Sequence, residues 1–483
     1  MKVKFLQEIL HGIDAREIPK IENIHVKKIV YDSRKVEESS LFVAIKGFTT
    51  DGHRYLMQAE KSGAVAVVVE EKNSRLHIPQ IVVDNSRFAL ARIAANYYTP
   101  EIDKIRLVGI TGTNGKTTTS YLVRSIMDQA GLKSGLIGTI AYDVGGNHIK
   151  AWNTTPESID LFGMLYDMYH RGQKGCVLEV SSHALELNRV DFLNFEVAVF
   201  TNLTQDHLDF HKDLTEYFNA KKKLFKHLNS TGRAVINIED PYGRKLLPEC
   251  QQDVMTFGFS DEAKVKAQDW KNSFAGLQVE IITPLGQFTV YSKLIGRFNI
   301  ENILTAVASG LALNFDLKTI KQGIEKVKII PGRLEVIKIK DAKTVVVDYA
   351  HTPDALHKAL TVLRDLTSQD LWVVFGCGGD RDTAKRPIMG KIAYDFADHV
   401  IITSDNPRSE PAQNIADMII QGISHSNQIH VELDRRKAIA HAIKRSKPGD
   451  TILVAGKGHE DYQEIKGVKY PFDDREVVKE ISG

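Results

Sequence analysis

Short apolar runs alternate with amphipathic stretches of helical length over most of this chain. The runs typical of buried strands lie at residues 106–112, 174–182, 197–203, 232–240, 343–351, 371–379, 399–407 and 450–458. Continuous apolar strands that alternate with amphipathic helices build βαβ units. The pattern therefore predicts α/β domains with largely parallel sheets.

Glycine and polar residues follow directly after these apolar runs. The run at residues 197–203 ends in "TNL", the run at 343–351 in "DYAH", and the run at 399–407 in "SDNP". Parallel α/β sheets bind ligands at the carboxyl ends of their strands. We therefore expect the binding residues at these strand ends.

The chain changes character at two places. Its 483 residues exceed what one hydrophobic core usually supports. Residues 97–104, "YYTPEIDK", are typical of a linker, and a Pro-Gly turn at residues 331–332 precedes a new strand. We predict three domains, at residues 1–100, 101–335 and 336–483.

Composition excludes only a few classes of protein. Hydrophobic residues make up 43% and charged residues 26%, and the net charge of +2 argues against a dedicated nucleic-acid binder. No stretch approaches the roughly 20 apolar residues of a membrane helix, and the N-terminus has no apolar signal-peptide core. Three cysteines are too few for a disulfide framework or a zinc site. We expect a cytoplasmic protein without membrane insertion.

Residues 109–122, "GITGTNGKTTTSYL", have the context of a phosphate-binding loop. A strand, a glycine turn and a helix start follow one another, so backbone N–H groups and the helix N-terminus face an anion. Lys116 adds positive charge, and Thr117 can ligate magnesium. The predicted ATP-binding residues of this loop are Gly112, Thr113, Asn114, Gly115, Lys116, Thr117 and Thr118.

This loop has only two residues between its glycines, where the usual Walker pattern has four. The alternative is a plain glycine turn with a surface lysine. Kinases, switches, transporters and ligases all use phosphate loops, so the loop alone does not select the reaction.

The compact loop resembles that of the Mur ligase and folylpolyglutamate synthetase family. Further motifs of this family follow in the same order, at residues 178–185, 201–211, 296–308, 331–335 and 348–356. The resemblance implies an N-terminal α/β uridine-nucleotide domain, a central P-loop ATPase-like domain and a C-terminal Rossmann-like domain. Such ligases join a carboxylate to an amine after ATP has converted the carboxylate to an acyl phosphate.

The resemblance also implies a magnesium site. Glu179 ends one predicted strand and His207 follows another, and with Thr117 they resemble the family's magnesium ligands. Taken alone, Glu179 is as well explained as a capping or paired carboxylate, and His207 as a core histidine. Together with Lys116 and Lys221, these two residues form the predicted catalytic set.

Lys221, in "YFNAKKKLF", aligns with the lysine that becomes a carbamate in this family. An ammonium would repel magnesium, whereas a carbamate offers two anionic oxygens to a metal. The alternative is a solvated basic face, because Lys222 and Lys223 are adjacent. ATP, Mg²⁺ and a carbamylated Lys221 are therefore the expected cofactors.

Four further residues are implied on the nucleotide side. Asn302 is expected to contact the adenine, and Arg333, Asp348 and His351 are expected to reach the nucleotide when the last domain closes. A buried salt bridge or a turn stabiliser is the alternative for any one of these residues.

Residues 31–55 resemble the uridine-nucleotide domain of the family members that add the third residue of the peptidoglycan stem peptide. The residues implied to bind the UDP-sugar-dipeptide are Tyr31, Ser33, Phe48, Thr49, Thr50, Asn153, Thr154, Thr155, Ser181 and Arg189. This chain has Leu187 where relatives often have a glutamine, which puts that one acceptor contact in doubt.

The last domain is expected to bind the incoming amino acid. The implied residues are Arg386, Asp405, Asn406, Pro407, Arg408, Gly456 and Glu460. The far end of meso-diaminopimelate carries a carboxylate and an ammonium, which Arg408 and Glu460 could pair. Lysine lacks that carboxylate and would leave the arginine unsatisfied. The alternative is an Asx-stabilised turn at residues 404–411.

The resemblance implies an ATP-dependent ligase that adds meso-diaminopimelate to UDP-N-acetylmuramoyl-L-alanyl-D-glutamate in peptidoglycan precursor synthesis. Its partners would be these small molecules and no nucleic acid, and a monomer is favoured. The rivals are a lysine-adding enzyme of the same type, a folylpolyglutamate synthetase, and a non-catalytic nucleotide-binding scaffold. Residues 31–55 have no place in a folylpolyglutamate synthetase.

Overall fold

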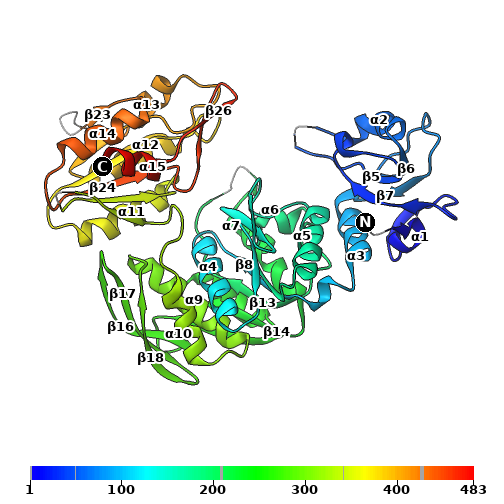
Figure 1. Cartoon of the computed structure of the whole chain (residues 1–483), viewed down its shortest axis with the longest axis horizontal. Helices are drawn as coiled ribbons and strands as arrows, with labels where there is room; N and C mark the ends of the chain where they lie inside the picture. The colour runs from blue at the N-terminus through cyan, green and yellow to red at the C-terminus, as the bar shows by residue number, and fades with distance from the viewer. Residues whose placement is uncertain (1–2, 49, 207–209, 341, 425–428, 483) are drawn as a thin grey trace. The chain divides into compact units, whose positions relative to one another are not determined.

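The computed structural model describes residues 3–48, 50–206, 210–340, 342–424 and 429–482. Figure 1 labels its helices and strands. The chain divides into two compact units. The first comprises Met1–Lys266, Thr283–Leu285 and Asn302–Gly323, and the second comprises Ala267–Ile282, Gly286–Glu301 and Ile324–Gly483.

The first unit begins with a five-stranded sheet in the order β2-β7-β6-β5-β4, which is parallel except at β2. Strands β5 and β7 are buried along their whole length, as expected for strands covered on both faces. The elements of this region are β1 (Lys4–Phe5), α1 (Leu6–Ile9), β2 (Ala15–Glu17), β3 (His25–Val26), β4 (Lys28–Val30), β5 (Ser40–Val43), α2 (Leu56–Lys61), β6 (Ala64–Val69), β7 (Gln80–Val83) and α3 (Ser86–Tyr98).

The central sheet of the first unit has the order β11-β10-β9-β12-β8-β13-β14-β15. Strands β9 to β15 are parallel in this order, and the β10–β11 hairpin adds an antiparallel edge. The strands are β8 (Arg106–Thr111), β9 (Ser134–Ile137), β10 (Ala141–Val144), β11 (Asn147–Lys150), β12 (Gly175–Glu179), β13 (Phe195–Phe200), β14 (Leu228–Asn237) and β15 (Asp253–Gly258).

Helices connect these strands, as the alternating pattern predicts. The helices are α4 (Lys116–Gln129), α5 (Ser158–His170), α6 (Ser182–Glu186), α7 (Leu214–Lys222), α8 (Pro241–Leu246), α9 (Arg297–Ala312) and α10 (Leu317–Lys326). Three strands between α8 and α9 were not predicted from the sequence. They are β16 (Val265–Ser273), β17 (Gly276–Thr283) and β18 (Gly286–Ser292).

The second unit contains a six-stranded sheet in the order β19-β20-β24-β21-β22-β23, which is parallel except at β19. Buried side chains of α11, α12 and α13 pack in one core cluster, and those of α14 and α15 in a second. The strands are β19 (Glu335–Lys338), β20 (Thr344–Asp348), β21 (Leu371–Phe375), β22 (His399–Ile402), β23 (Ile429–Val431), β24 (Thr451–Ala455), β25 (Tyr462–Ile465) and β26 (Val468–Pro471).

The helices of this second sheet are α11 (Pro353–Leu366), α12 (Lys385–Phe396), α13 (Ala412–Ile420), α14 (Arg435–Arg445) and α15 (Asp474–Ser482). The predicted α/β class with mostly parallel sheets is confirmed, because all eight apolar runs form strands of parallel sheets. Among the helices that the structure describes, none is long and apolar enough to cross a membrane.

A buried ion pair joins α14 to α15 and reaches the strand ends. Both side chains, Arg435 and Asp474, are fully buried, and their two hydrogen bonds measure 2.7 and 2.6 Å. Arg435 also donates to the carbonyl oxygens of Ser404 (3.4 Å) and Ala455 (3.0 Å), just beyond β22 and at the end of β24. One guanidinium therefore ties together two strand ends that flank β21.

We predict that Asp474→Asn destabilises the second unit by about 3–5 kcal/mol, because it leaves the Arg435 charge buried without compensation. Urea unfolding and amide hydrogen exchange in β22 and β24 measure this loss. Glu480→Gln is the control, since it breaks only the exposed Arg436–Glu480 pair (2.7 Å) and should have little effect. Equal unfolding midpoints for the two variants would contradict the prediction.

Candidate active site

The phosphate-binding loop lies between the end of β8 and the start of α4. Gly112 and Gly115 have φ angles of 145° and 83°, which side chains of L-residues rarely adopt. A Cβ at Gly112 would lie 1.9 Å from the Thr201 hydroxyl oxygen, and one at Gly115 would lie 2.4 Å from the Asn302 amide oxygen. Only glycine fits at these two positions.

The loop is held by the end of β13, the strand next to β8. The Thr113 and Asn114 backbone N–H groups donate to the Asn202 carbonyl (2.9 Å) and side-chain oxygen (2.8 Å). The Thr201 hydroxyl donates to the Asn114 carbonyl at 2.7 Å. Lys116 folds back, and its Nζ donates to the carbonyls of Gly112 and Thr113 at 2.8 Å each. The predicted loop residues are thus held in one rigid turn.

Glu179 ends β12, the neighbour of β8 on the other side. Its side chain is fully buried and accepts hydrogen bonds from the Thr117 hydroxyl (2.9 Å), the Thr139 N–H (3.1 Å) and the Thr139 hydroxyl (3.0 Å). Within the described residues this carboxylate has no cationic partner. A buried carboxylate with only neutral donors suits a bound cation.

The structure describes only some of the other predicted metal ligands. His207 lies outside the described residues. The described ranges contain no group of three or more His, Cys, Asp or Glu side chains that could bind a metal. The predicted set, in contrast, combines Glu179 with a threonine, a modified lysine and His207.

Lys221 is buried beside the phosphate loop. It lies on α7, is 1% exposed, and its Nζ is 2.8 Å from the Gly112 carbonyl oxygen. Burial, and then the nearby charge of Lys116, hold the pKa of Lys221 well below its usual value, which favours the uncharged amine. Lys222 and Lys223 instead pair with Glu249 and Glu186. The alternative of a solvated basic face is therefore wrong for Lys221.

Three predicted acceptor residues gather next to Glu179. The Thr155 hydroxyl donates to the Glu179 carbonyl at 2.8 Å and accepts from the Ser181 N–H at 3.1 Å. Arg189 donates to the Thr155 carbonyl at 2.9 Å and forms an ion pair with Glu157 at 2.8 Å. Arg189 shares the Glu157 carboxylate with Arg87, which also lies 2.8 Å from it.

The remaining "NTTP" residues line the same region. The Thr154 and Thr139 hydroxyls are 3.2 Å apart, and the Tyr142 hydroxyl donates to the Asn153 carbonyl. Leu187 forms the C-cap of α6. Thr139 and Tyr142 were not predicted, because neither belongs to a recognisable motif.

The predicted uridine residues are more scattered. The Tyr31 hydroxyl donates to Asp160 at 2.7 Å, and burial and then Asp160 raise the pKa of Tyr31. Ser33 is buried, whereas Phe48 is 74% exposed with its ring 5.8 Å from that of Phe210. The Thr50 carbonyl accepts from the Gly47 N–H, and Thr49 lies outside the described residues.

Asn302 and the other predicted nucleotide residues belong to different units. Asn302 lies in the first unit beside Gly115, and Arg333, Asp348 and His351 lie in the second. Asp348 is partly buried and accepts from the Leu334 and Ala350 N–H groups. Burial raises the pKa of Asp348, and the charge of Arg333 opposes this rise.

An aromatic cluster surrounds these residues in the second unit. The Arg333 guanidinium lies 4.9 Å from the Tyr349 ring centre, and His351 and His459 lie 4.5 and 4.9 Å from it. Burial lowers the pKa of His459 to about 3, so this imidazole is neutral. Tyr349 and His459 were not predicted as site residues, although Tyr349 lies in the motif at residues 348–356 and His459 directly precedes the predicted Glu460.

Four predicted amino-acid-binding residues meet at the ends of β22 and β24. The Asn406 amide nitrogen donates to Glu460 at 2.8 Å, and a Cβ at Gly456 would lie 2.5 Å from the Asp405 carboxylate. Lys457 is fully buried and donates to the Asn406 amide oxygen (3.0 Å) and to Glu460 (3.1 Å). Lys457 was not predicted, yet it fixes the orientation of the Asn406 amide.

The two predicted arginines differ in their surroundings. Arg386 is fully buried, and both of its Nη atoms donate to Glu410 at 2.8 Å. Arg408 has a φ angle of 52°, and its Nη1 donates to the Gly379 carbonyl at 2.7 Å. The hydrogen bond from the Asn406 N–H to Asp405 (2.7 Å) joins adjacent residues, so it is not the Asx turn of the alternative, which needs the N–H two residues on. This bond does not involve Arg408.

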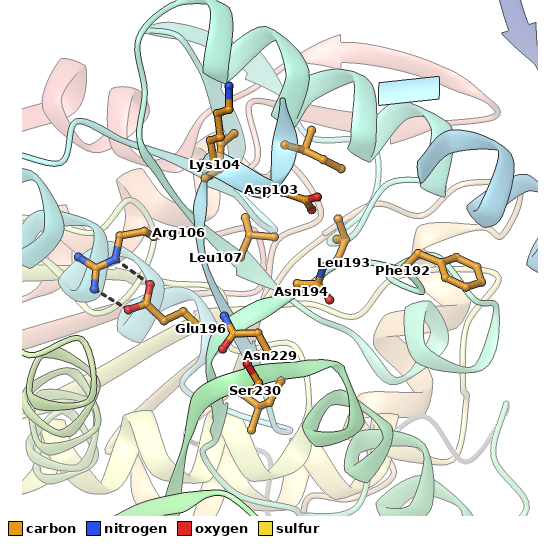
Figure 2. Close-up of a pocket in the computed structure, with 13 residues that line it drawn as sticks. Asp103, Lys104, Arg106, Leu107, Phe192, Leu193, Asn194, Glu196, Asn229 and Ser230 are labelled. Carbon is orange, nitrogen blue, oxygen red and sulfur yellow. Dashed lines mark hydrogen bonds and ion pairs between the residues drawn. The ribbon is translucent and has the colours of Figure 1, made fainter. Parts of the chain in front are cut away.

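A separate cavity of about 560 Å³ opens at the amino ends of β8, β13 and β14, the opposite end from the phosphate loop. Figure 2 shows the Arg106–Glu196 ion pair, with bonds of 2.7 and 2.6 Å, at its wall. None of the predicted site residues lines this cavity. This cavity is therefore distinct from the predicted active site.

Comparison with known proteins covers most of the chain. Residues 25–98 match the family model described as "Mur ligase family, catalytic domain". Residues 110–310 match "Mur ligase middle domain", and residues 332–458 match "Mur ligase, glutamate ligase domain".

Two relatives match over nearly their full length. A Geobacter metallireducens protein named "UDP-N-acetylmuramoyl-L-alanyl-D-glutamate--2,6-diaminopimelate ligase" is 44% identical, over 98% of this chain and 97% of its own. A solved structure of a ligase with the same name is 35% identical, with a TM-score of 0.72, over 100% of this chain and 99% of its own.

A more distant likeness supports the fold alone. The crystal structure of MurF ligase from Thermotoga maritima in complex with ADP is 22% identical, with a TM-score of 0.65, over 94% of this chain and 97% of its own. The family predicted from the motifs is confirmed by all three domain matches and by the relatives. The chain belongs to the Mur ligase family.

Proposed function

We propose that this protein is an ATP-dependent ligase that adds meso-diaminopimelate to UDP-N-acetylmuramoyl-L-alanyl-D-glutamate in peptidoglycan precursor synthesis. The observation that carries the proposal is the meeting of three groups around the phosphate loop. These are the Lys116 cation, the buried Glu179 carboxylate and the buried amine of Lys221. The name of the Geobacter metallireducens relative supports this substrate pair.

The reaction needs two displacements. The D-glutamate γ-carboxylate attacks the γ-phosphorus of ATP, which forms an acyl phosphate and releases ADP. The amine of the amino acid then attacks the acyl carbon, phosphate leaves, and the nitrogen loses a proton to give the amide. The loop N–H groups and the α4 N-terminus would hold the phosphates, and Lys116 would turn from the Gly112 carbonyl toward them.

Mg²⁺ fits the donors around Glu179. Thr117, Glu179, His207 and a carbamate on Lys221 would hold it, and the assignment is supported by the lack of a cationic partner for Glu179 among the residues that the structure describes. When bound, Mg²⁺ neutralises charge on the phosphate oxygens. Burial lowers the pKa of the Lys221 amine and so favours its uncharged form, which can add to carbon dioxide, form an N–C bond and lose one proton.

Arg408, Asn406 and Glu460 suit a zwitterionic amino acid end. The arginine is a cation for the distal carboxylate, and Glu460 is an anion for the distal ammonium. Incubation with ATP, Mg²⁺, the UDP-dipeptide and either meso-diaminopimelate or lysine tests the proposal. A product with the mass of the diaminopimelate adduct, together with ADP, is expected. The lysine adduct alone, or no ADP release, would refute it.

We predict that Lys116→Ala abolishes ADP formation and leaves the fold intact. The lysine's charge serves the transferring phosphoryl group, and its Nζ donates to the loop carbonyls of Gly112 and Thr113. Coupled-enzyme detection of ADP and circular dichroism measure the two effects. Near-normal turnover by a folded Lys116→Ala protein would contradict the assignment of this loop as the ATP-binding site.

We predict that Lys221→Ala is nearly inactive and is partly rescued by a short added carboxylate, which replaces the carbamate oxygens. Because burial lowers the pKa of Lys221, the amine stays neutral as the pH falls below the usual lysine pKa. Carbamate formation, and activity with it, should be lost only when the pH falls through this lowered pKa. Removal and return of bicarbonate at neutral pH should therefore lower and restore wild-type activity. A free amine in the fully active enzyme, seen by crystallography, would contradict this.

We predict that Arg408→Ala lowers kcat/KM for diaminopimelate by about thirty-fold to nearly a thousand-fold, equivalent to about 2–4 kcal/mol. It removes a charge-assisted contact to a desolvated carboxylate. Lysine should lose little from its already low rate, and KM for ATP and for the UDP-dipeptide should hardly change. Full retention of the preference for diaminopimelate would make Arg408 a turn residue only.

A further inference from the structure

The β25–β26 hairpin extends along the loop that carries Arg408. The Arg408 N–H donates to the Glu464 carbonyl at 3.0 Å, and the Lys466 N–H donates to the Arg408 carbonyl at 2.7 Å. These two bonds make a parallel bridge between Arg408 and Ile465. The loop after β22 is therefore paired to the hairpin through its backbone.

Side chains add two more bonds between the hairpin and this loop. Gln463 Nε2 donates to the Asp405 carbonyl at 2.9 Å. The Glu464 N–H donates to the Asn406 amide oxygen, also at 2.9 Å. Three hairpin residues, Gln463, Glu464 and Lys466, thus fix three of the predicted amino-acid-binding positions.

Arg408 needs this support because of its backbone conformation. Its φ angle of 52° lies in the left-handed region, which non-glycine residues occupy only where the surrounding structure holds them. The bonds on both its N–H and its carbonyl come from the hairpin. The hairpin therefore fixes the backbone position from which the Arg408 side chain extends.

The guanidinium of Arg408 is fixed on two of its edges. Nη1 donates to the Gly379 carbonyl at 2.7 Å, and Nε lies 3.4 Å from the Glu464 carboxylate. A Cβ at Gly378 would lie 2.9 Å from Nη1, so glycine leaves room for this contact. Nη2 has no hydrogen-bond partner in the described part of the chain. An arginine can serve a second carboxylate through such a free edge.

We propose that the β25–β26 hairpin is the substrate-selecting element of this enzyme, and that Glu464 is the positioning residue that aims Arg408 at the distal carboxylate of the amino acid. This inference rests on the proposed function. The hairpin begins beyond residue 458, where the match to the family's last domain ends. Glu464 acts through Arg408 and does not touch the substrate.

The first test is Glu464→Gln, which keeps the backbone bonds and the side-chain length and removes the charge. Both partners are about four-fifths buried, with 21% and 23% of their side chains exposed, so solvent screens the pair only partly. We expect KM for diaminopimelate to rise about three- to ten-fold. The values of kcat, KM for ATP and KM for the UDP-dipeptide should stay unchanged.

The matched control is Glu480→Gln, which also removes a glutamate charge from an arginine. Its partner is Arg436 at 2.7 Å, and more than half of both side chains is exposed. We expect this control to leave all kinetic constants unchanged. An equal rise in KM for diaminopimelate in both variants would assign the effect to general charge and overturn the proposal.

A double-mutant cycle separates positioning from direct contact. If Glu464 acts through Arg408, then Glu464→Gln added to Arg408→Ala should cause no further loss with diaminopimelate. A full additional loss in the double variant would overturn the positioning role. Rescue by Glu464→Asp, which restores the charge one methylene shorter, should be partial.

Amide hydrogen exchange at Arg408 and Lys466 checks the hairpin itself. Both amides should remain protected in Glu464→Gln, because their acceptors are backbone carbonyls. Lost protection together with a raised KM would place the effect in the backbone pairing and overturn the role of the Glu464 side chain. Wild-type turnover with an unchanged KM in Glu464→Gln would overturn this inference alone. No diaminopimelate product from the wild-type enzyme would instead overturn the proposed function.

Discussion

The missing side chain of Gly112 is the constraint on which the central site depends. A Cβ there would lie 1.9 Å from the Thr201 hydroxyl oxygen, so any other residue would push the loop off the end of β13. The close approach also leaves the Gly112 carbonyl open to two lysines. Lys116 and Lys221 both place Nζ 2.8 Å from that oxygen. Burial, together with repulsion from the nearby Lys116 charge, lowers the pKa of Lys221.

In the second unit, charged side chains that lie close together form ion pairs. Arg386 pairs with Glu410, Lys457 with Glu460, and Arg408 with Glu464. The amino-acid-binding region is therefore nearly neutral without a substrate, although it is rich in charged groups. A zwitterion can bind there by sharing existing pairs, without leaving a new charge uncompensated.

Local patterns were enough to predict the parallel sheets and the loop, and long-range contacts explain what was missed. Every continuous apolar run forms a strand, because burial on both faces of a parallel sheet demands such runs. Strands β16 to β18 have alternating burial instead, which is a weaker signal. Lys221 is buried because of how α7 packs. No local pattern distinguishes it from the adjacent Lys222 and Lys223.

In the candidate site, too, local patterns predicted some residues, and others depend on long-range contacts. Motif residues such as Glu179, Asn406 and Arg408 were predicted because they follow strands, and their assigned roles stay predictions. Their partners were not predicted. Glu464 lies 56 residues after Arg408, and Glu157 lies 32 residues before Arg189, so only the folded chain pairs them.

The Arg435 guanidinium has a consequence for molecules designed against this site. It bonds the Ser404 and Ala455 carbonyls at once, and these residues directly precede Asp405 and Gly456. The spacing of the two loops is therefore set before any ligand arrives. A rigid inhibitor that matches this spacing would lose little conformational entropy on either side of the interface, whereas a flexible one would forfeit affinity in becoming ordered.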